Sequence, residues 1–587
     1  MLDASCVAEI RRSLRLAHRT WVSSWAQAAY FLRFQAECFP MSCSDCCQQE
    51  PDLTGSRQGA VAHDLTSWSD VEIPDQPPEM TVNGLGGMAS LTTAFGMREK
   101  GVAADLSWNL YVAERIYTTD WEILRGISLR DSFRSGGSLW RNRQRVEAQE
   151  DPFHRSRHVE ELDVFVSHTW ASGGWSKWLS LLMQSGCNCA LSGWLLGNVA
   201  AAAMSYADLL PLPLRLSPST DAFSEVCALG PWSMILGFLG TALGFLLSPY
   251  LPRCKSDMCF IDAACVSQSD EALMTRGIRG IGGFLRVSKE LRIVWTDLYL
   301  SRLWCVFELA TFKKINPDGT VVMAPIFLET TVVLFYISNL CAASVQMVLR
   351  AGGSTRVLFA LPIISLPFLV LVHRLRRSFV QKHKLFSQFQ QFELDSARCV
   401  SDSDCEFIYA TIDQLYGSKE AFVSYVRGSL REELLGPMTR SVLPETYTLL
   451  IMSPFVSLHL DLSVALSKQG APFAVVLLYL VAALVIGGFL IIRISINVMI
   501  LLCDRFAKPA HGSVIVDYLQ TLFIFLAVLL CLLLGSRMVL EAFGTNRWEL
   551  VPGLFIGFAL MYIAVNWLQR KSDARRLKKT SETSTSD

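Results

Sequence analysis

The sequence has few charged residues and no excess of either sign. Of its 587 residues only 18% are charged, and 53 Lys and Arg residues balance 53 Asp and Glu residues. Binding to nucleic-acid phosphates needs an excess of Lys and Arg on one face of a protein. The balance therefore gives no support to a nucleic-acid partner, and we expect none. A wholly soluble chain is excluded as well, because the mean hydropathy of +0.32 is too high for one.

The sequence also lacks the regular cysteine framework of a disulfide-rich protein. Several of its 17 cysteines lie inside apolar runs, which predicts free thiols in a reduced, cytosol-facing chain. The densest group is Cys38, Cys43, Cys46 and Cys47. Tetrahedral zinc prefers two separated pairs of ligands, whereas Cys46 and Cys47 are adjacent, so we expect no metal site here. Lipidation and plain free thiols both stay open for this group.

Long apolar runs are what the sequence does contain. A helix needs roughly 20 apolar residues to cross a bilayer, and on this measure we expect about eight spans. The fifth is the weakest, because it contains His459 and Asp461. The segments rich in Lys and Arg then lie on one side with both termini, which predicts cytoplasmic termini. The expected spans are Leu191–Leu212, Gly230–Leu251, 328–349, Val357–Val372, Tyr447–Leu466, Ala471–Ile492, Val514–Leu534 and Leu550–Trp567.

The N-terminal region has three parts of different composition. Residues 1–35 carry apolar side chains at helical spacing with arginines mostly off that stripe, which predicts an amphipathic helix. This helix lies on an anionic membrane surface, packs on the domain that follows, or is a transit peptide. Residues 36–89 are rich in Ser, Asp, Gln, Pro and Gly without periodicity, as in a disordered linker. Residues 90–159 predict a soluble lead-in region.

An alternation of strands and helices follows. The stretch Met258–Lys314 predicts strand, helix, strand and helix, with the helices at Leu273–Leu285 and Ser301–Lys313. Such an alternation is typical of a parallel sheet with crossover helices. An earlier strand is predicted within DVFVSHTW, Asp163–Trp170.

These motifs together resemble a TIR (Toll and interleukin receptor type) domain. The order FID, RG, an Ile/Leu helix, RIVW and YLSRLWCVFEL is similar to the middle of that family's domain, and DVFVSHTW is similar to its first strand. The resemblance covers roughly a quarter of the chain and implies a flavodoxin-like α/β domain on the cytoplasmic side, interrupted by membrane hairpins and joined to an α-helical transmembrane bundle. The expected segments after the lead-in are 160–188 and 253–327 as parts of this domain, 189–252 and 328–373 as hairpins, 374–443 as a cytoplasmic helical segment, 444–569 as a four-span region and 570–587 as a tail.

Two segments have open assignments. The run Val321–Ile326 is either the fourth strand of the sheet or part of the third span. If it is a strand, a linker around Leu328–Thr331 has to turn the chain back toward the membrane. Phe389–Leu394 is a candidate fifth strand, with helices expected over Cys405–Tyr416 and Ser418–Leu435.

The resemblance implies chemistry at a single glutamate. Many TIR domains cleave NAD and release nicotinamide, and their catalytic glutamate lies on the helix with the Trp-Cys…Glu-Leu signature; here that residue is Glu308. Nicotinamide is bonded in NAD as a cation and leaves as a neutral molecule, so the reaction needs no general acid. One carboxylate near the ribose can stabilise the oxocarbenium-like charge. The chain would then bind NAD as a substrate, with no resident cofactor.

Candidate nucleotide-binding residues surround this glutamate. Ser167, His168 and Thr169 follow the first strand, but the family's usual aromatic, Arg and Gly are His168, Thr169 and Trp170 here, which weakens the enzyme reading. Asp262 ends the second strand. Trp304 lies one helical turn before Glu308, where its indole shelters the site or packs beneath it. The loop Ala263–Arg276 borders the same cleft or, as its counterpart does in adaptor members of the family, makes contacts between domains.

The expected function is a membrane-anchored TIR-like signalling protein with the lipid bilayer and further copies of itself as partners, with or without NAD cleavage. The alternatives are a transporter or channel with a regulatory TIR-like domain, for which His459 and Asp461 would line the path, and a non-catalytic scaffold. The closely spaced glycines Gly277–Gly283 do not follow a strand, so they predict close helix packing rather than a phosphate-binding turn.

Overall fold

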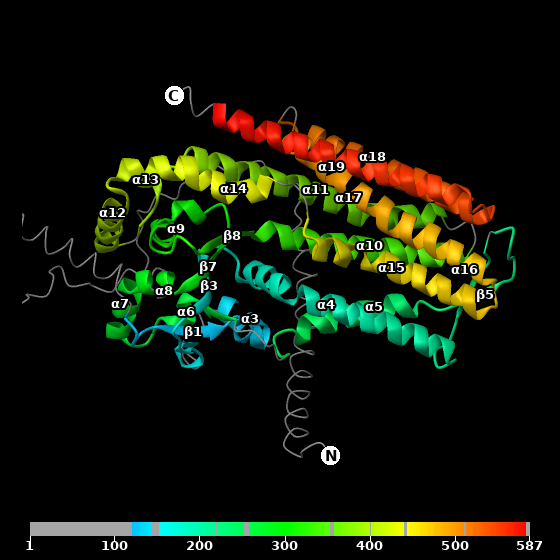
Figure 1. The fold of residues 1–587 in the computed structure, drawn as a ribbon, viewed down its shortest axis with the longest axis horizontal. Helices are drawn as coiled ribbons and strands as arrows, with labels where there is room; N and C mark the ends of the chain where they lie inside the picture. The colour runs from blue at the N-terminus through cyan, green and yellow to red at the C-terminus, as the bar shows by residue number, and fades with distance from the viewer. Residues whose placement is uncertain are drawn as a thin grey trace, which may run out of the picture.

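The molecule has a mixed β-sheet with short helices at one end and a bundle of long helices at the other (Figure 1). A computed structural model describes residues 120–141, 152–218, 220–251, 257–352, 357–399, 401–439, 443–509 and 512–582. The amphipathic helix expected over 1–35, the linker over 36–89, the cysteines within them and the start of the lead-in region lie outside these residues.

The sheet has six strands in the order β2-β1-β6-β3-β7-β8. Strands β6, β3, β7 and β8 are parallel, whereas β1 pairs antiparallel with both β6 and β2. Counted along the chain, the parallel strands lie in the order second, first, third, fourth. The strands are β1 (Arg125–Ser128), β2 (Arg157–His158), β3 (Leu162–His168), β6 (Met258–Phe260), β7 (Ser288–Trp295) and β8 (Thr320–Pro325).

Short helices and one long helix cover the sheet. α8 (Ile281–Arg286) and α9 (Leu303–Ile315) pack against β3 and against each other, and α12 (Asp402–Tyr416) packs on α9. α4 (Gly174–Tyr206) adds Leu181 and Leu182 to the same core as the buried β3 residue Phe165. Strands β3 and β7 are mostly buried, which explains why their apolar parts, Val164–Val166 and Ile293–Trp295, read as continuous runs rather than as alternating ones.

The first expected hairpin is built from one unusually long helix. The span expected at Leu191–Leu212 is the later part of a longer helix, α4, which is continuous over 33 residues from Gly174 to Tyr206. Its first turns pack on the sheet, and its later turns pack closely along α5 (Trp232–Leu247). The short strands β4 (Leu214–Leu216) and β5 (Cys227–Leu229) form an antiparallel pair between the two helices.

The open assignment of Val321–Ile326 is resolved in an unexpected way. β8 is a true sheet strand, since Glu290 to Trp295 of β7 pair with Thr320 to Pro325 in parallel register. α10 (Ile326–Gly352) begins at the next residue, so no linker intervenes at Leu328–Thr331. Both α4 and α10 leave the sheet region and meet where Gln184 donates a hydrogen bond to Glu329.

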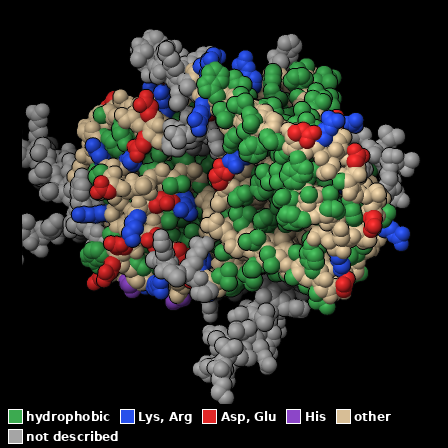
Figure 2. Space-filling model, turned by 45° about the vertical axis from the view of Figure 1, so that its right-hand side comes forward, with side chains coloured by type: hydrophobic (Ala, Val, Ile, Leu, Met, Phe, Trp, Pro, Cys, Tyr) green, Lys and Arg blue, Asp and Glu red, His purple; other side chains and the backbone are tan. Residues whose placement is uncertain are grey.

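Among the residues that the structure describes, six helices are long and apolar enough to cross a membrane, which indicates a membrane protein. They are Gly174–Tyr206, Ile326–Ala351, Glu445–Lys468, Phe473–Arg505, Val514–Gly544 and Leu550–Asp573. The other two expected spans, Gly230–Leu251 and Val357–Val372, fall on the shorter apolar helix α5 and on the first part of α11 (Val357–Gln390). Apolar side chains cover much of the helical part in Figure 2, whereas many charged side chains gather on the part that holds the sheet.

The helices of the bundle differ in regularity. The segment Phe473–Arg505 consists of α16 (Phe473–Tyr479), a 12-residue π-helix (Leu480–Ile491) and α17 (Ile492–Arg505). The remaining long helices are α15 (Glu445–Lys468), α18 (Val514–Gly544) and α19 (Leu550–Glu582). π-Helices are rare and usually short, so this one marks a departure from ordinary span geometry.

Three expectations about the soluble part were wrong. Phe389–Leu394 is not a fifth strand, because α11 continues to Gln390 and a 3₁₀ turn (Leu394–Ser396) follows. The helix expected over Leu273–Leu285 is two helices, α7 (Glu271–Arg279) and α8, separated at Gly280. The single helix expected over Ser418–Leu435 is divided, since α13 (Lys419–Tyr425) is followed by a π-helical turn (Val426–Leu430) and by α14 (Arg431–Thr439).

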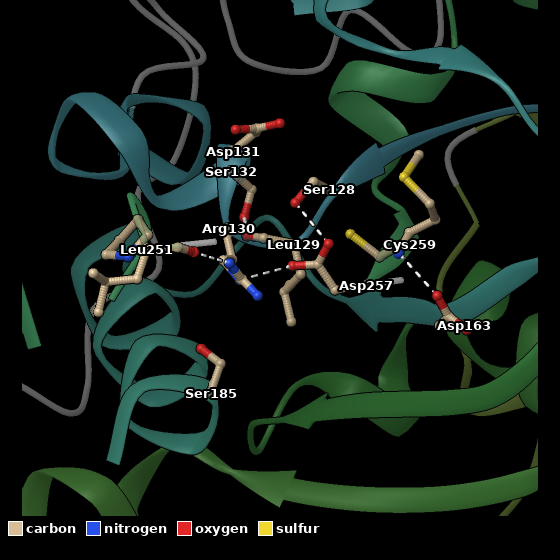
Figure 3. A network of polar contacts seen from close by, with 12 residues as sticks. Ser128, Leu129, Arg130, Asp131, Ser132, Asp163, Ser185, Leu251, Asp257 and Cys259 are labelled. Atoms are coloured by element: carbon tan, nitrogen blue, oxygen red, sulfur yellow. Dashed lines mark hydrogen bonds and ion pairs between the residues drawn. The ribbon is translucent and has the colours of Figure 1, made fainter. Parts of the chain in front are cut away.

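The end of the lead-in region belongs to the sheet domain. β1 and β2 extend the sheet, and a polar network joins β1 to the chain that follows α5 and to the start of β6 (Figure 3). Arg130 forms an ion pair of 3.2 Å with Asp257 and donates to the Leu251 carbonyl, while Ser128 donates to Asp257 at 2.8 Å. Asp257, at the start of β6, is therefore joined to β1 directly. Through Arg130 it is also joined to the chain that follows α5.

Replacing Asp257 by alanine is expected to lower stability by about 2 kcal/mol, since Arg130 and Ser128 both lose a partner in a partly buried position. Thermal unfolding of the full chain in detergent measures the effect. The control is Asp131→Ala, which breaks a more exposed pair with Arg134 and is expected to cost less than about 0.5 kcal/mol. Equal effects of the two substitutions would show that the network does not hold these segments together.

Candidate functional site

The candidate site lies at the carboxyl ends of the parallel strands. The chain leaves β3 toward β6 on one side and later returns to β7 on the other side. Parallel sheets bind ligands in the crevice at such a reversal of strand order. Ser167 and His168 end β3, Asp262 follows β6, and Tyr299 and Glu308 come from the turn and helix after β7.

Glu308 and Ser167, both expected as site residues, lie in hydrogen-bond contact. The Ser167 hydroxyl donates a hydrogen bond to Oε2 of Glu308 and lies 2.6 Å from the hydroxyl of Tyr299. The Tyr299 hydroxyl also lies 3.3 Å from the Cys305 carbonyl oxygen, to which it can donate. Ser167, Tyr299 and Cys305 are buried, while Glu308 keeps some solvent access. The carboxyl group therefore lies at the edge of a buried polar cluster.

Burial dominates the electrostatics of this cluster. Loss of solvation raises the pKa of Glu308 from 4.5 to about 8; the Ser167 hydrogen bond opposes the rise, and the Asp262 carboxylate adds to it. Burial also raises the pKa values of Tyr299 and Cys305, and the charge of Glu308 contributes to both. Both groups therefore stay neutral, and Glu308 is the member of the cluster that changes charge near neutral pH.

His168 lies on the other side of the sheet. Successive side chains of a strand point to opposite faces, so His168 cannot join Ser167 at Glu308. Its ring contacts Trp140, with ring centres 5.4 Å apart, and Trp170, with ring centres 4.6 Å apart. Its backbone carbonyl oxygen contacts the side of the sheet that holds Glu308. There the Cys305 thiol lies 3.7 Å from this oxygen.

Asp262 binds an aromatic side chain of the loop after β3. The indole N–H of Trp170 donates to Oδ2 of Asp262 at 2.7 Å, and the Lys177 ammonium lies 5.0 Å from the centre of the Trp170 ring. Lys177 comes from the first turn of α4 and is buried. An aromatic side chain between an acid and a cation fills this end of the crevice and fixes the loop.

Trp304 and Thr169 have roles other than those expected. The indole of Trp304 donates to Asp404 of α12 at 3.2 Å, so it is held by that helix. Thr169 is buried and uses its hydroxyl to accept a bond of 3.3 Å from the Ala171 amide within the loop. Among the described residues, the hydrogen-bond partners of these two side chains do not include Glu308.

The loop expected over Ala263–Arg276 is largely helical. α6 (Asp262–Cys265) and α7 occupy most of it, and Asp270 caps α7 by accepting a bond from the Leu273 amide. Arg276 forms ion pairs with Asp120 and Glu122 at the end of the lead-in region. The segment is therefore partly occupied by contacts within the chain.

The polar pair in the fifth expected span has local partners. Asp461 accepts hydrogen bonds from the backbone amides of Ser233 at 2.7 Å and Met234 at 3.2 Å, which caps the first turn of α5. The His459 ring lies 2.8 Å from the Tyr479 hydroxyl. Capping gives Asp461 a structural role, which weakens the case for a transport path through it.

Tyr299, Trp170 and Lys177 were not predicted as site residues. Tyr299 lies inside the quoted motif YLSRLWCVFEL, and Trp170 ends DVFVSHTW, so their neighbourhood was marked but their contacts were not. Among the described residues, no group of three or more His, Cys, Asp and Glu side chains could hold a metal ion. Comparison of the chain with protein-family models, curated proteins and solved structures finds no match in any of the three.

Proposed function

We propose that this protein is a membrane-anchored TIR-like signalling protein that cleaves NAD through Glu308. The observation that carries the proposal is the hydrogen bond from Ser167 to Glu308 at the reversal of strand order. A flavodoxin-like domain has parallel strands in the order 2-1-3-4-5, and the four parallel strands here follow its first four positions. The resemblance of the two sequence motifs to TIR domains supports the same assignment.

The proposed reaction converts NAD and water into nicotinamide and ADP-ribose. The bond between ribose C1′ and the nicotinamide nitrogen breaks, and its electron pair leaves with nicotinamide, which becomes neutral. Water then bonds to C1′ and releases a proton. Glu308 as a carboxylate stabilises the positive charge that develops on the ribose and can accept that proton. Ser167 is a positioning residue, because its hydroxyl holds one carboxylate oxygen in place.

The proposed topology has eight spans with both termini in the cytoplasm. The six long apolar helices, with α5 and the first part of α11, supply the spans. The basic segments Arg253–Lys314, Arg374–Lys384 and Arg493–Lys508 then share one side, in keeping with the positive-inside tendency. In this topology the TIR-like domains of several copies lie on the same side of one membrane, where they can assemble with one another to signal.

A non-catalytic scaffold is the second candidate, and the filled crevice favours it. Ser167, His168 and Thr169 are all buried, and Trp170 occupies the space beside Asp262. A nucleotide would have to displace this indole. The scaffold uses the same surfaces for assembly without binding NAD.

The test is nicotinamide release by the purified full-length protein, reconstituted in liposomes at high surface density to favour assembly. We expect release in proportion to protein, with release by the folded Glu308→Gln variant lower by roughly a hundredfold or more. Absence of release from wild type in liposomes and in detergent would reject the enzyme and leave the scaffold. Release that Glu308→Gln retains would reject Glu308 as the catalytic residue.

A further inference from the structure

A buried carboxyl group lies where three long helices meet below the sheet. Glu329, in the first turn of α10, has only 2% of its surface exposed. Gln184 of α4 donates to its Oε1 at 3.0 Å, and the Tyr447 hydroxyl of α15 donates to the same oxygen at 3.3 Å. The second oxygen, Oε2, is buried and has no hydrogen-bond partner among the described residues.

No opposite charge in the described part of the chain is paired with the Glu329 carboxyl group. Among the described residues, Glu329 forms no ion pair with Lys, Arg or His. Besides Glu329, the groups that act electrostatically on Tyr447 of α15 are Cys187 of α4 and Arg292 of β7, and Glu445 lies in the first turn of α15. Arg292 is paired with Glu290, and Glu445 with Arg493, so neither is directed at Glu329. A buried carboxylate with one oxygen unbound and no counter-charge is costly, and such groups in membrane helices commonly bind a ligand.

The neighbouring side chains are hard oxygen donors. The Ser180 hydroxyl lies within hydrogen-bonding reach of Glu329, and Gln184 contacts both Ser180 and Glu329. Rotation of the Gln184 amide by half a turn would present its carbonyl oxygen in place of its nitrogen. The 3.3 Å between the Tyr447 hydroxyl and Oε1 is close to the separation of about 3.4 Å between oxygens that share a cation with bonds of about 2.4 Å.

We propose that Ser180, Gln184, Glu329 and Tyr447 form a binding site for one monovalent cation of the size of Na⁺. One carboxylate matches one positive charge, and the absence of sulfur and imidazole donors from the set disfavours transition metals. The cation joins α4, which follows β3, to α10, which follows β8, and to α15. Its occupancy therefore fixes how the sheet domain is held on the bundle, independently of any reaction at Glu308.

The test is thermal unfolding of the full-length protein in detergent, with NaCl replaced by KCl or choline chloride at constant ionic strength. A ligand that binds only the folded state raises the unfolding midpoint with its concentration. We expect Na⁺ to raise the midpoint of wild type by several degrees relative to choline, with a smaller effect of K⁺. Glu329→Gln keeps the size and the hydrogen bonds of the side chain but removes its charge, and is expected to abolish the dependence on Na⁺.

Further variants separate binding from general stability. Ser180→Ala and Tyr447→Phe each remove one oxygen and are expected to raise the Na⁺ concentration needed for half the effect roughly tenfold. Glu445→Gln on the same helix is the control and is expected to respond to Na⁺ as wild type does. A wild-type midpoint indifferent to Na⁺, or a Na⁺ response that Glu329→Gln retains, would overturn the proposal. A midpoint that follows pH alone would overturn it in favour of a bound proton.

Discussion

Nicotinamide release is expected to fall by roughly a hundred- to a thousandfold when Glu308 is replaced by glutamine. Glutamine has the shape of glutamate and can still accept the Ser167 hydrogen bond, so the cluster with Tyr299 is expected to persist. The substitution removes the negative charge beside the ribose. This negative charge stabilises the reaction only as the oxocarbenium-like positive charge develops. The loss is therefore expected in kcat as well as in kcat/KM. Release assays at saturating and low NAD concentration measure the two quantities.

The pH profile of wild type distinguishes catalysis from a structural role. Because only the carboxylate is active and the pKa of Glu308 is raised to about 8, kcat/KM is expected to rise about tenfold per pH unit below pH 8 and to level off above it. Bound NAD places a nicotinamide cation near the carboxylate, which favours the charged form, so the kcat profile is expected to level off at a lower pH. A profile that falls between pH 6 and pH 8 would contradict a catalytic carboxylate.

Stability gives an independent control on the same residue. The folded-state pKa of about 8 exceeds the ordinary value of 4.5, so between these pH values the folded state holds a proton that the unfolded state has released. Glu308 therefore makes the free energy of unfolding decrease as pH rises through this window, by an amount on the order of a few kcal/mol at most. Glu308→Gln is expected to remove this decrease, which also shows that the variant is folded.

Periodicity predicted most of the elements, and its failures have local causes. Each of the eight apolar runs coincides with a helix over most of its length, because a span is defined by composition over many residues, although Leu191–Leu212 continues past the end of α4 at Tyr206. β1 was missed because Arg125–Ser128 is short, contains Gly126 and has no alternation. The expected strand Phe389–Leu394 has a strand-like composition, but the helix that begins at Val357 continues to Gln390. Tertiary context decides such short segments.

The sequence predicts the parts of the candidate site that follow from the order of strands and helices, but not the contacts between segments far apart in the chain. Ser167 lies at the end of β3 and Glu308 lies on the helix after β7, the strand beside β3 in the sheet, and both elements are visible in the sequence. Alternation along β3 could also have placed His168 on the opposite face. The partner of Trp304 could not be predicted, because Asp404 comes from a helix 100 residues later. The same holds for Glu329, whose neighbours Gln184 and Tyr447 are far away in sequence.

The close contact between α4 and α5 depends on glycines that belong to no motif identified in the sequence. Gly193 of α4 faces Gly240 of α5 so closely that a Cβ added to either would lie 2.1 Å from the carbonyl oxygen of the other. Gly197 and Gly244 make similar approaches, to the carbonyl oxygens of Leu236 and Cys189. Small residues let helix backbones approach in this way, and the resulting contact holds apolar helices together in lipid.

Replacing Gly193 by valine is expected to separate α4 from α5 and to cost more than about 3 kcal/mol, because the obstacle is backbone, which cannot rotate away. Since Arg130 contacts the carbonyl of Leu251, four residues after α5 ends at Leu247, loss of the contact between α4 and α5 also removes support from β1 and β6. The measurement is the folded fraction of the detergent-solubilised chain by size-exclusion chromatography, with its thermal midpoint. Gly557→Val is the matched control: it makes the same change in the apolar helix α19, where a Cβ meets nothing within 4 Å, and is expected to leave both values near those of wild type. If Gly193→Val behaved like Gly557→Val, the close contact of α4 and α5 would not be what holds the hairpin to the sheet domain.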